Sequence, residues 1–174
     1  PLDLVRALLA VSPRPLPVAT ALSWIWPDAE TVDQRKAFDV ALLRARRLLG
    51  DESLLRLDAG VLSFDAERVW TDTAALLALA ERVPAAGDGT AAAAWAADWL
   101  DLVRGPLLPD DEAPWVLAAR ERLRRRAAAA AERIVGLLEP TAAALAREVL
   151  QRAFDADPAS DPLARGLAVS LAAS

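Results

Sequence analysis

The sequence of 174 residues contains no cysteine, histidine, tyrosine or methionine, and Lys36 is its only lysine. Without cysteine there is no disulfide, no thiolate nucleophile and no cysteine-ligated zinc. Without histidine, a catalytic triad is excluded, metal sites have only carboxylate ligands, and no side chain titrates near neutrality at its ordinary pKa. We therefore expect a protein that is not an enzyme, has no catalytic residues and needs no cofactor.

Aromatic residues and long apolar runs are also scarce. Hydrophobic residues make up 55% of the chain but aromatic ones only 5%, so the core must consist mostly of aliphatic side chains and alanine, which favours packed helices. No apolar run approaches the roughly 18 residues of a membrane span, and no signal-peptide pattern opens the chain. We expect a cytoplasmic protein that does not enter a membrane.

Three helices are predicted in the first fifty residues. The first spans 2–11, the second begins near Pro17 and ends at Trp26, and the third spans 31–49. In the third helix, spacings of four and three residues place the following side chains on one inward face: Phe38, Leu42, Ala45 and Leu49. Gly50 is a natural helix end.

After the third helix the apolar pattern shortens to two runs, 54–57 and 61–64, on either side of Asp58-Ala59-Gly60. This pattern predicts a β-hairpin with a tight turn. We also assign a third strand to 69–70. Three helices followed by a small hairpin is the layout of a winged-helix domain, which we assign to residues 1–71.

The remainder, residues 72–174, is predicted to be helical throughout, without a flexible linker at the boundary. The expected helices span 73–83, 90–103, 114–137, 141–155 and 161–173, with a break at 84–89, Thr90 as a cap and a turn at 139–141. The predicted fold class is therefore mainly α: a winged helix-turn-helix with a small β-hairpin, followed by an α-helical tetratricopeptide-like array.

Several stretches of sequence support a more specific assignment. Three of them are residues 26–28, 35–50 and 69–72. The other is a discontinuous run formed by 104–109, 114–116 and 120–124. Together they resemble the SARP-type bacterial transcription regulators, in which a winged helix precedes a bacterial transcriptional activator domain. Ala146, Leu150, Ala153 and Pro158 are similar to second-helix positions of a tetratricopeptide repeat. The resemblance implies that the winged helix binds operator DNA and that the helical part mediates assembly with itself or with other proteins.

Candidate DNA contacts follow from the third helix and the hairpin: Arg35, Lys36, Arg44, Arg46, Arg47 and Arg56. The resemblance places Lys36 and Arg44 at positions that commonly touch DNA, and cations on such a helix can contact phosphates or guanine edges. Asp39 and the hairpin tip at Asp58 oppose binding. Residues 1–70 carry nine basic and ten acidic side chains, a net charge of −1. We therefore expect DNA binding that is weak or dependent on a dimer.

The main alternative is a winged helix that has lost DNA binding and serves protein interaction or oligomerisation. In this alternative an apolar surface is formed by Trp24, Val40 and Leu43. Two further groups have simpler interpretations. We interpret the arginine-rich stretch at 120–126 as a solvated helix face, with contacts to acidic partners or to the Asp110-Asp111-Glu112 loop as the alternative. Asp110-Asp111-Glu112 lacks a regular ligand spacing and is interpreted as a solvated loop without a metal.

Because the sequence offers no imidazole or thiolate ligand, folding should not depend on a metal. We predict that thermal unfolding followed by circular dichroism is the same with and without EDTA. A decrease of several degrees in the melting temperature on adding EDTA would contradict this prediction.

Overall fold

A computed structural model describes residues 1–83, 91–138 and 142–172. The chain divides into two compact units. The first contains Pro1–Ala74 and Asp110–Ala119, and the second contains Ala75–Pro109 and Arg120–Ser174. A division at residue 71, as expected from sequence, assigns 110–119 to the second part, whereas the structure groups this segment with the first unit.

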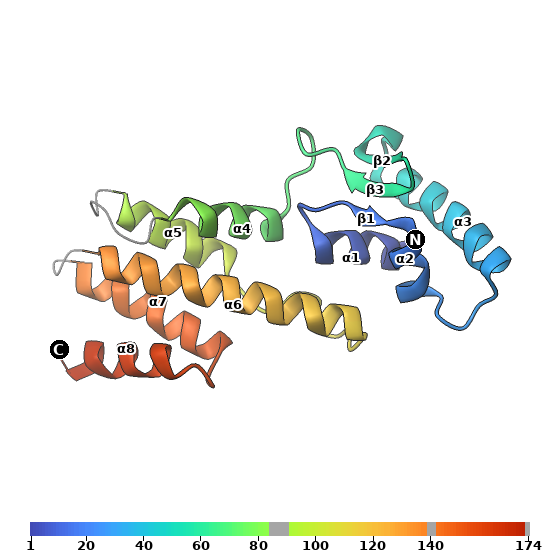
Figure 1. Ribbon diagram of the computed structural model, residues 1–174. Helices are drawn as coiled ribbons and strands as arrows, with labels where there is room; N and C mark the ends of the chain where they lie inside the picture. The colour runs from blue at the N-terminus through green and yellow to red at the C-terminus, as the bar shows by residue number, and fades with distance from the viewer. Residues whose placement is uncertain (84–90, 139–141, 173–174) are drawn as a thin grey trace. The chain divides into compact units, whose positions relative to one another are not determined.

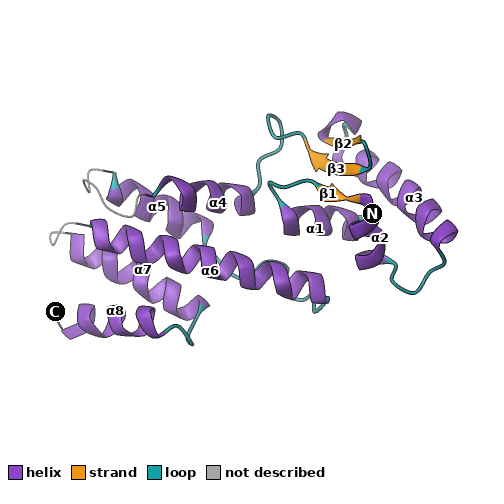
Figure 2. Cartoon of the chain, in the orientation of Figure 1, coloured by secondary structure: helices purple, strands orange, loops and turns teal. Residues whose placement is uncertain are grey.

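Up to residue 71, the first unit contains three α-helices and three short strands (Figures 1 and 2). In chain order they are α1 (Leu2–Val11), β1 (Leu16–Pro17), α2 (Val18–Ile25), α3 (Thr31–Leu49), the 3-10 turn η1 (Glu52–Leu54), β2 (Leu55–Asp58) and β3 (Val61–Phe64). The helices at 2–11 and 31–49 are those predicted from apolar spacing. Gly50 ends α3 in a left-handed conformation with φ of 77°, which glycine adopts without steric cost.

The three strands form an antiparallel sheet in the order β1-β3-β2. Leu16 is opposite Leu62, and Leu55 is opposite Phe64. Ala59 and Gly60 have φ of 46° and 78°, so both central residues of the hairpin turn have positive φ, the pattern of a two-residue I′ turn. The predicted hairpin is therefore confirmed.

The strand predicted at 69–70 is wrong. Val69 N–H donates to Asp65 O at 2.8 Å, within a turn that follows β3. The third strand is instead β1, which comes before α2 in the chain. Two residues are too few to show an alternating pattern in the sequence, and Pro17, which lacks an N–H, is tolerated because β1 lies at the edge of the sheet.

One apolar cluster fills the first unit. Phe38, Leu42 and Ala45 enter it from α3, as their spacing predicted. They pack among buried residues of α1 and all three strands, including Leu4, Leu8, Leu16, Leu55 and Leu62. This burial determines which residues of α3 are exposed, because the residues between the buried positions of a helix lie on its opposite side.

All assigned secondary structure after residue 71 in the described ranges is helical: α4 (Asp72–Arg82), α5 (Ala92–Leu102), α6 (Pro114–Leu137), α7 (Ala143–Ala156) and α8 (Asp161–Ala172). The mainly helical class with a small antiparallel sheet is thus confirmed. The expected break at 84–89, the cap at Thr90 and the turn at 139–141 lie outside the described residues. None of the helices within the described ranges has the length and apolar content needed to cross a membrane.

The second unit has a core of aliphatic residues, alanine and one large aromatic. Trp99 is fully buried, and its indole Nε1–H donates to Ala127 O on α6 at 3.0 Å. The inward face of α6 carries small side chains, including Ala127, Ala130 and Ala131, which leave room for neighbouring helices to pack closely. Gly166 on α8 leaves similar room for Leu150 of α7. A Cβ on Gly166 would lie 3.2 Å from Leu150 Cδ2, so this position favours a residue without a side chain.

The core of the first unit gives a direct test of the fold. Phe38→Ala removes a fully buried ring, and we predict that it lowers the free energy of unfolding of the first unit by about 3–5 kcal/mol. Val32→Ala on the exposed side of the same helix should change it by less than about 0.5 kcal/mol. Urea unfolding measures both variants. Equal effects of the two substitutions would show that α3 does not pack as described.

Candidate functional site

The exposed face of α3 is the candidate site, and it is mixed in character. Val40 and Leu43 expose 46% and 43% of their surface, although both are aliphatic. Lys36, Arg44 and Arg47 are exposed on the same helix. The structure therefore places cations beside apolar side chains, rather than a continuous basic stripe.

Two of the predicted DNA contacts have acidic neighbours on their own helix. Arg35 Nε lies 3.4 Å from Asp39 Oδ1, and its guanidinium lies over the ring of Phe38, 5.6 Å from the centroid. Lys36 Nζ lies 3.9 Å from Asp33 Oδ1. Exposed pairs of this kind contribute little to stability. Their carboxylates nevertheless reduce the positive potential that α3 presents to a polyanion.

Arg46 and Arg56 are engaged in contacts that hold the hairpin. The Nε and Nη2 groups of Arg46 both donate to Leu55 O, at 3.2 and 2.9 Å, and so join α3 to β2. Arg56 Nη2 lies 2.6 Å from Oδ2 of the buried Asp65. These contacts leave no pattern in a linear sequence, so the sequence alone could not separate the two arginines from candidate DNA contacts.

Arg44 and Arg47 differ from the other cations of α3. Within residues 1–83, 91–138 and 142–172, no hydrogen bond or ion pair of either side chain is found. Both are exposed, on the last two turns of the helix. Among the six predicted DNA contacts, these two guanidinium groups can bind an anion without first giving up a hydrogen bond or an ion pair to another described residue.

The hairpin tip brings no cation to the site. Its turn consists of Asp58, Ala59 and Gly60, as expected from the sequence. At the other end of the hairpin, Asp51 accepts hydrogen bonds from the backbone N–H of Ser53 at 2.8 Å and from its hydroxyl at 2.7 Å. Arg68 Nη2 donates to Asp51 at 2.6 Å. The hydrogen bond from the Ser53 side chain, followed by that from Arg68, lowers the pKa of Asp51 to about 2.

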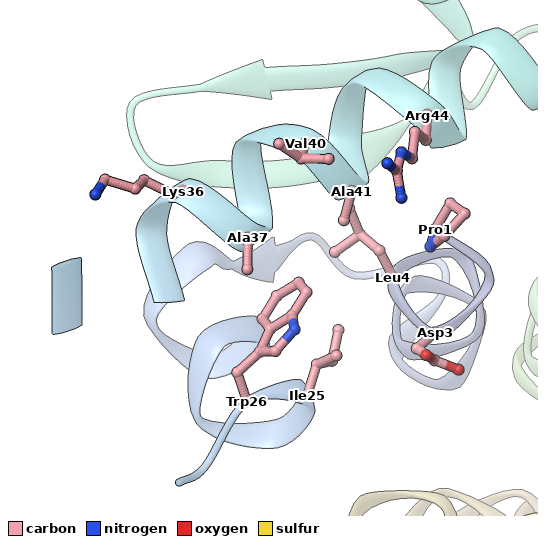
Figure 3. A pocket seen from close by; sticks show the side chains of 10 residues that line it. All are labelled: Pro1, Asp3, Leu4, Ile25, Trp26, Lys36, Ala37, Val40, Ala41 and Arg44. Carbon is pink, nitrogen blue, oxygen red and sulfur yellow. The ribbon is translucent and has the colours of Figure 1, made fainter. Parts of the chain in front are cut away.

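A groove of about 450 Å³ lies beside α3, in the first unit (Figure 3). The ends of α1 and α2 form its other sides, and the residues that line it are Pro1, Asp3, Leu4, Ile25, Trp26, Lys36, Ala37, Val40, Ala41 and Arg44. Its floor is apolar, and its two cationic side chains, Lys36 and Arg44, both come from α3. The sequence pattern did not predict this groove, because its residues come from three separate segments.

The three residues predicted as a protein interface are not equivalent. Trp24 is half-buried, and its ring stacks on that of Trp115 with centroids 5.6 Å apart and an interplanar angle of 6°. This contact engages one face of the Trp24 ring, since stacked aromatic rings shield each other from water. The exposed apolar surface predicted on α3 is thus formed by Val40 and Leu43.

The arginine-rich stretch of α6 is mostly engaged within the second unit. Arg120 donates to Leu107 O at 2.6 Å and to Leu108 O, so it holds the loop before α6. Arg124 pairs with Glu121 and with Asp157. Two arginines of α6 contact α4: Arg126 Nη1 lies 2.9 Å from Glu81 Oε1, and Arg133, further along α6, donates to Ala80 O at 2.6 Å. The stretch is therefore a set of internal contacts rather than a simple solvated face.

The acidic loop before α6 has a local structural role. The Asp111 carboxylate accepts the backbone N–H of Ala113 at 3.1 Å, next to the first turn of α6. In the part of the chain that the structure describes, no cluster of three or more potential metal ligands occurs. The candidate site therefore consists of the exposed face of α3 and the adjoining groove.

Comparison with known proteins adds no assignment. No protein-family model matches the sequence, and no curated protein matches it significantly.

The cluster at Asp51 makes a prediction about pH. Because the pKa of Asp51 in the folded state is about 2, below its ordinary value of 3.8, the ionised carboxylate stabilises the fold above pH 3.8. This contribution is lost as the pH falls toward 2. Asp51→Asn should remove it, so stability should depend less on pH between about 4 and 2 in the variant. Urea unfolding at several pH values measures this, and parallel curves for variant and wild type would refute it.

Proposed function

We propose that the chain is a regulator of bacterial transcription, in which the first unit is a winged helix that presents α3 to DNA. The observation that carries this proposal is the order α1-β1-α2-α3-β2-β3, with the strands arranged β1-β3-β2. In a winged helix this order makes the third helix the recognition helix and the β2–β3 hairpin the wing. The resemblance of residues 26–28 and 35–50 to SARP-type regulators supports the same assignment.

Arg44 and Arg47 are the best candidates for DNA contacts in this proposal, because neither has a partner within the described residues. Lys36 is the third, since its neighbour Asp33 is 3.9 Å away and both side chains are well exposed. Asp39 and Asp58 carry charge of the wrong sign for a phosphate backbone. We therefore propose that one copy of the chain binds DNA weakly and that a dimer binds it more tightly. Few side chains would contact bases, so the preference for one DNA sequence over another would be small.

The helices of the second unit are proposed to form a tetratricopeptide-like array for assembly with itself or with other proteins. The packed pairs of helices support this proposal, as does the internal use of the arginines of α6. Repeat-like helical arrays commonly bind other proteins through an extended surface. As a transcription regulator, the protein would act in the cytoplasm, where bacterial DNA lies.

DNA binding should be mostly electrostatic, but its dependence on salt should be shallow because few phosphates are contacted. With two or three phosphate contacts, log affinity should fall against log salt with a slope of about −2 to −3. We predict that Arg44→Glu and Arg47→Glu each abolish binding to a random duplex, measured by fluorescence anisotropy. Arg125→Glu, a charge reversal in the second unit, is the matched control and should leave binding unchanged. Loss of binding in the control but not in Arg44→Glu would place the DNA site elsewhere.

A second candidate function is a winged helix that binds protein instead of DNA through α3. The exposure of Val40 and Leu43 favours it, because aliphatic side chains in the centre of a DNA-reading surface make no hydrogen bonds to bases. The acidic hairpin tip favours it as well. In this candidate, Arg44→Glu leaves DNA affinity at its low background level, and substitutions at Leu43 alter protein binding.

A further inference from the structure

We propose that the groove beside α3 binds an acidic amphipathic helix of a partner protein. This inference rests on the second candidate function, protein binding through α3, and specifies its site and the chemistry of the partner. It does not require that the chain binds DNA. Three features of the groove support this proposal: its apolar floor, the spacing of its two cationic side chains and its open form.

The floor of the groove can bury apolar side chains of a partner. It is formed by half-buried Ile25 and Trp26 from the end of α2, Leu4 from α1, and Ala37 and Ala41 from α3. Figure 3 shows the Trp26 ring beneath Ala37, with Ile25 beside it. Trp26 is large and partly accessible, and such aromatic residues are enriched among the anchors of protein interfaces.

The charges at the groove define what the partner must carry. Lys36 and Arg44 are eight residues apart on α3, which corresponds to about 12 Å along the helix axis. Figure 3 shows them at opposite ends of the labelled part of α3, with Trp26, Ile25 and Leu4 between. Two carboxylates separated by seven or eight residues on a partner helix have the same separation, about 10.5–12 Å. An apolar side chain midway between them would reach the floor.

The other charged side chain of the groove does not cancel this attraction. Asp3 pairs with Arg6 on α1, at 3.3 Å. In Figure 3 its carboxylate points away from Trp26 and Ile25. Arg44, by contrast, has no partner within the described residues and points from α3 toward Leu4 and Pro1. A carboxylate of the partner would therefore supply the first ion pair of Arg44 in this unit.

The form of the groove favours a helix over a small ligand or a DNA strand. Its volume of about 450 Å³ is within the range of small-molecule pockets, about 300–1,000 Å³, but its rim residues Lys36, Val40 and Arg44 are exposed, so a small ligand would remain largely in water. A phosphate backbone would gain nothing from an apolar floor. Helices that lie in apolar grooves place anchors at spacings of three, four and seven residues, which fits the distances given above.

The test uses the complete chain and a synthetic helical peptide of about 16 residues. Its Glu residues are at positions 4 and 11, Leu at positions 7 and 8, and Ala and Gln elsewhere, with blocked termini and a fluorescent label. Anisotropy titration should show saturable binding. Replacing both Glu by Gln, or both Leu by Ala, should weaken binding by about tenfold or more, since each tenfold corresponds to about 1.4 kcal/mol.

Matched variants of the protein locate the site. Arg44→Glu should weaken peptide binding by at least about tenfold, whereas Arg47→Glu, nearly one turn further along α3 and outside the groove lining, should change it by less than about twofold. Val40→Glu should also weaken it, because it places a carboxylate on the rim, between the two cations that attract the peptide. Circular dichroism of each variant should match the wild type, since all three positions are exposed.

Each other outcome has a defined meaning. No binding by the wild-type chain at about 1 mM peptide, or equal weakening by Arg44→Glu and Arg47→Glu, would overturn the groove assignment. Weakening by Leu43→Asp alone would also overturn it but would leave protein binding through α3 standing. Binding of random duplex DNA is measured without the peptide, so failure of the DNA proposal does not affect this result. Peptide binding that is independent of the Leu pair would indicate a general affinity for polyanions, including DNA, and would contradict the proposal.

Discussion

Burial of one face of α3 in the core of the first unit is the constraint on which the candidate site depends. Phe38, Leu42 and Ala45 are removed from water, and full burial of a side chain such as Phe or Leu contributes about 1.5–3 kcal/mol each. Because the helix turns once every 3.6 residues, this inward face leaves Lys36, Val40 and Arg44 on the outer side. The chemistry of the surface is thus determined by the same residues that stabilise the core.

Arginine supplies most of the side-chain hydrogen-bond donors that histidine, tyrosine and lysine provide in other proteins. With one lysine and no histidine, nearly every cation of the chain is a guanidinium, which has five N–H donors in a fixed planar arrangement. Arg46 uses two of these donors on one carbonyl of β2, and Arg120 uses two on the loop before α6. Arginines thus stabilise loops and strand ends in both units. Arg44 and Arg47 are notable because the described structure gives them no such role.

The helices and the hairpin could be predicted from sequence because their signals are local. Apolar spacings of three and four residues located α3, and Gly50 marked its end. Two short apolar runs on either side of a turn located β2 and β3. The edge strand β1 could not be predicted, since two residues carry no periodicity and one of them is proline. Its position is set by pairing with β3, far along the chain.

The candidate site was predicted only in part for a similar reason. The helical period alone indicated that Lys36, Val40, Leu43 and Arg44 face outward. The stacking of Trp24 on Trp115 and the pairing of Arg56 with buried Asp65 depend on how distant segments fold together. The groove also combines three segments, so no linear pattern contains it. Segment 110–119, which lies in the helical half of the sequence, belongs to the first unit for the same reason.

The outer side of α3, with its groove, is the binding surface proposed for this protein. The most direct test is to record backbone amide NMR spectra of the isotope-labelled chain during separate titrations with the acidic peptide and with a random DNA duplex. The account predicts that the peptide shifts the amide signals of Trp26, Lys36, Val40 and Arg44 and leaves those of α7 and α8 unchanged. Shifts confined to the second unit, with α3 unaffected by either ligand, would contradict it.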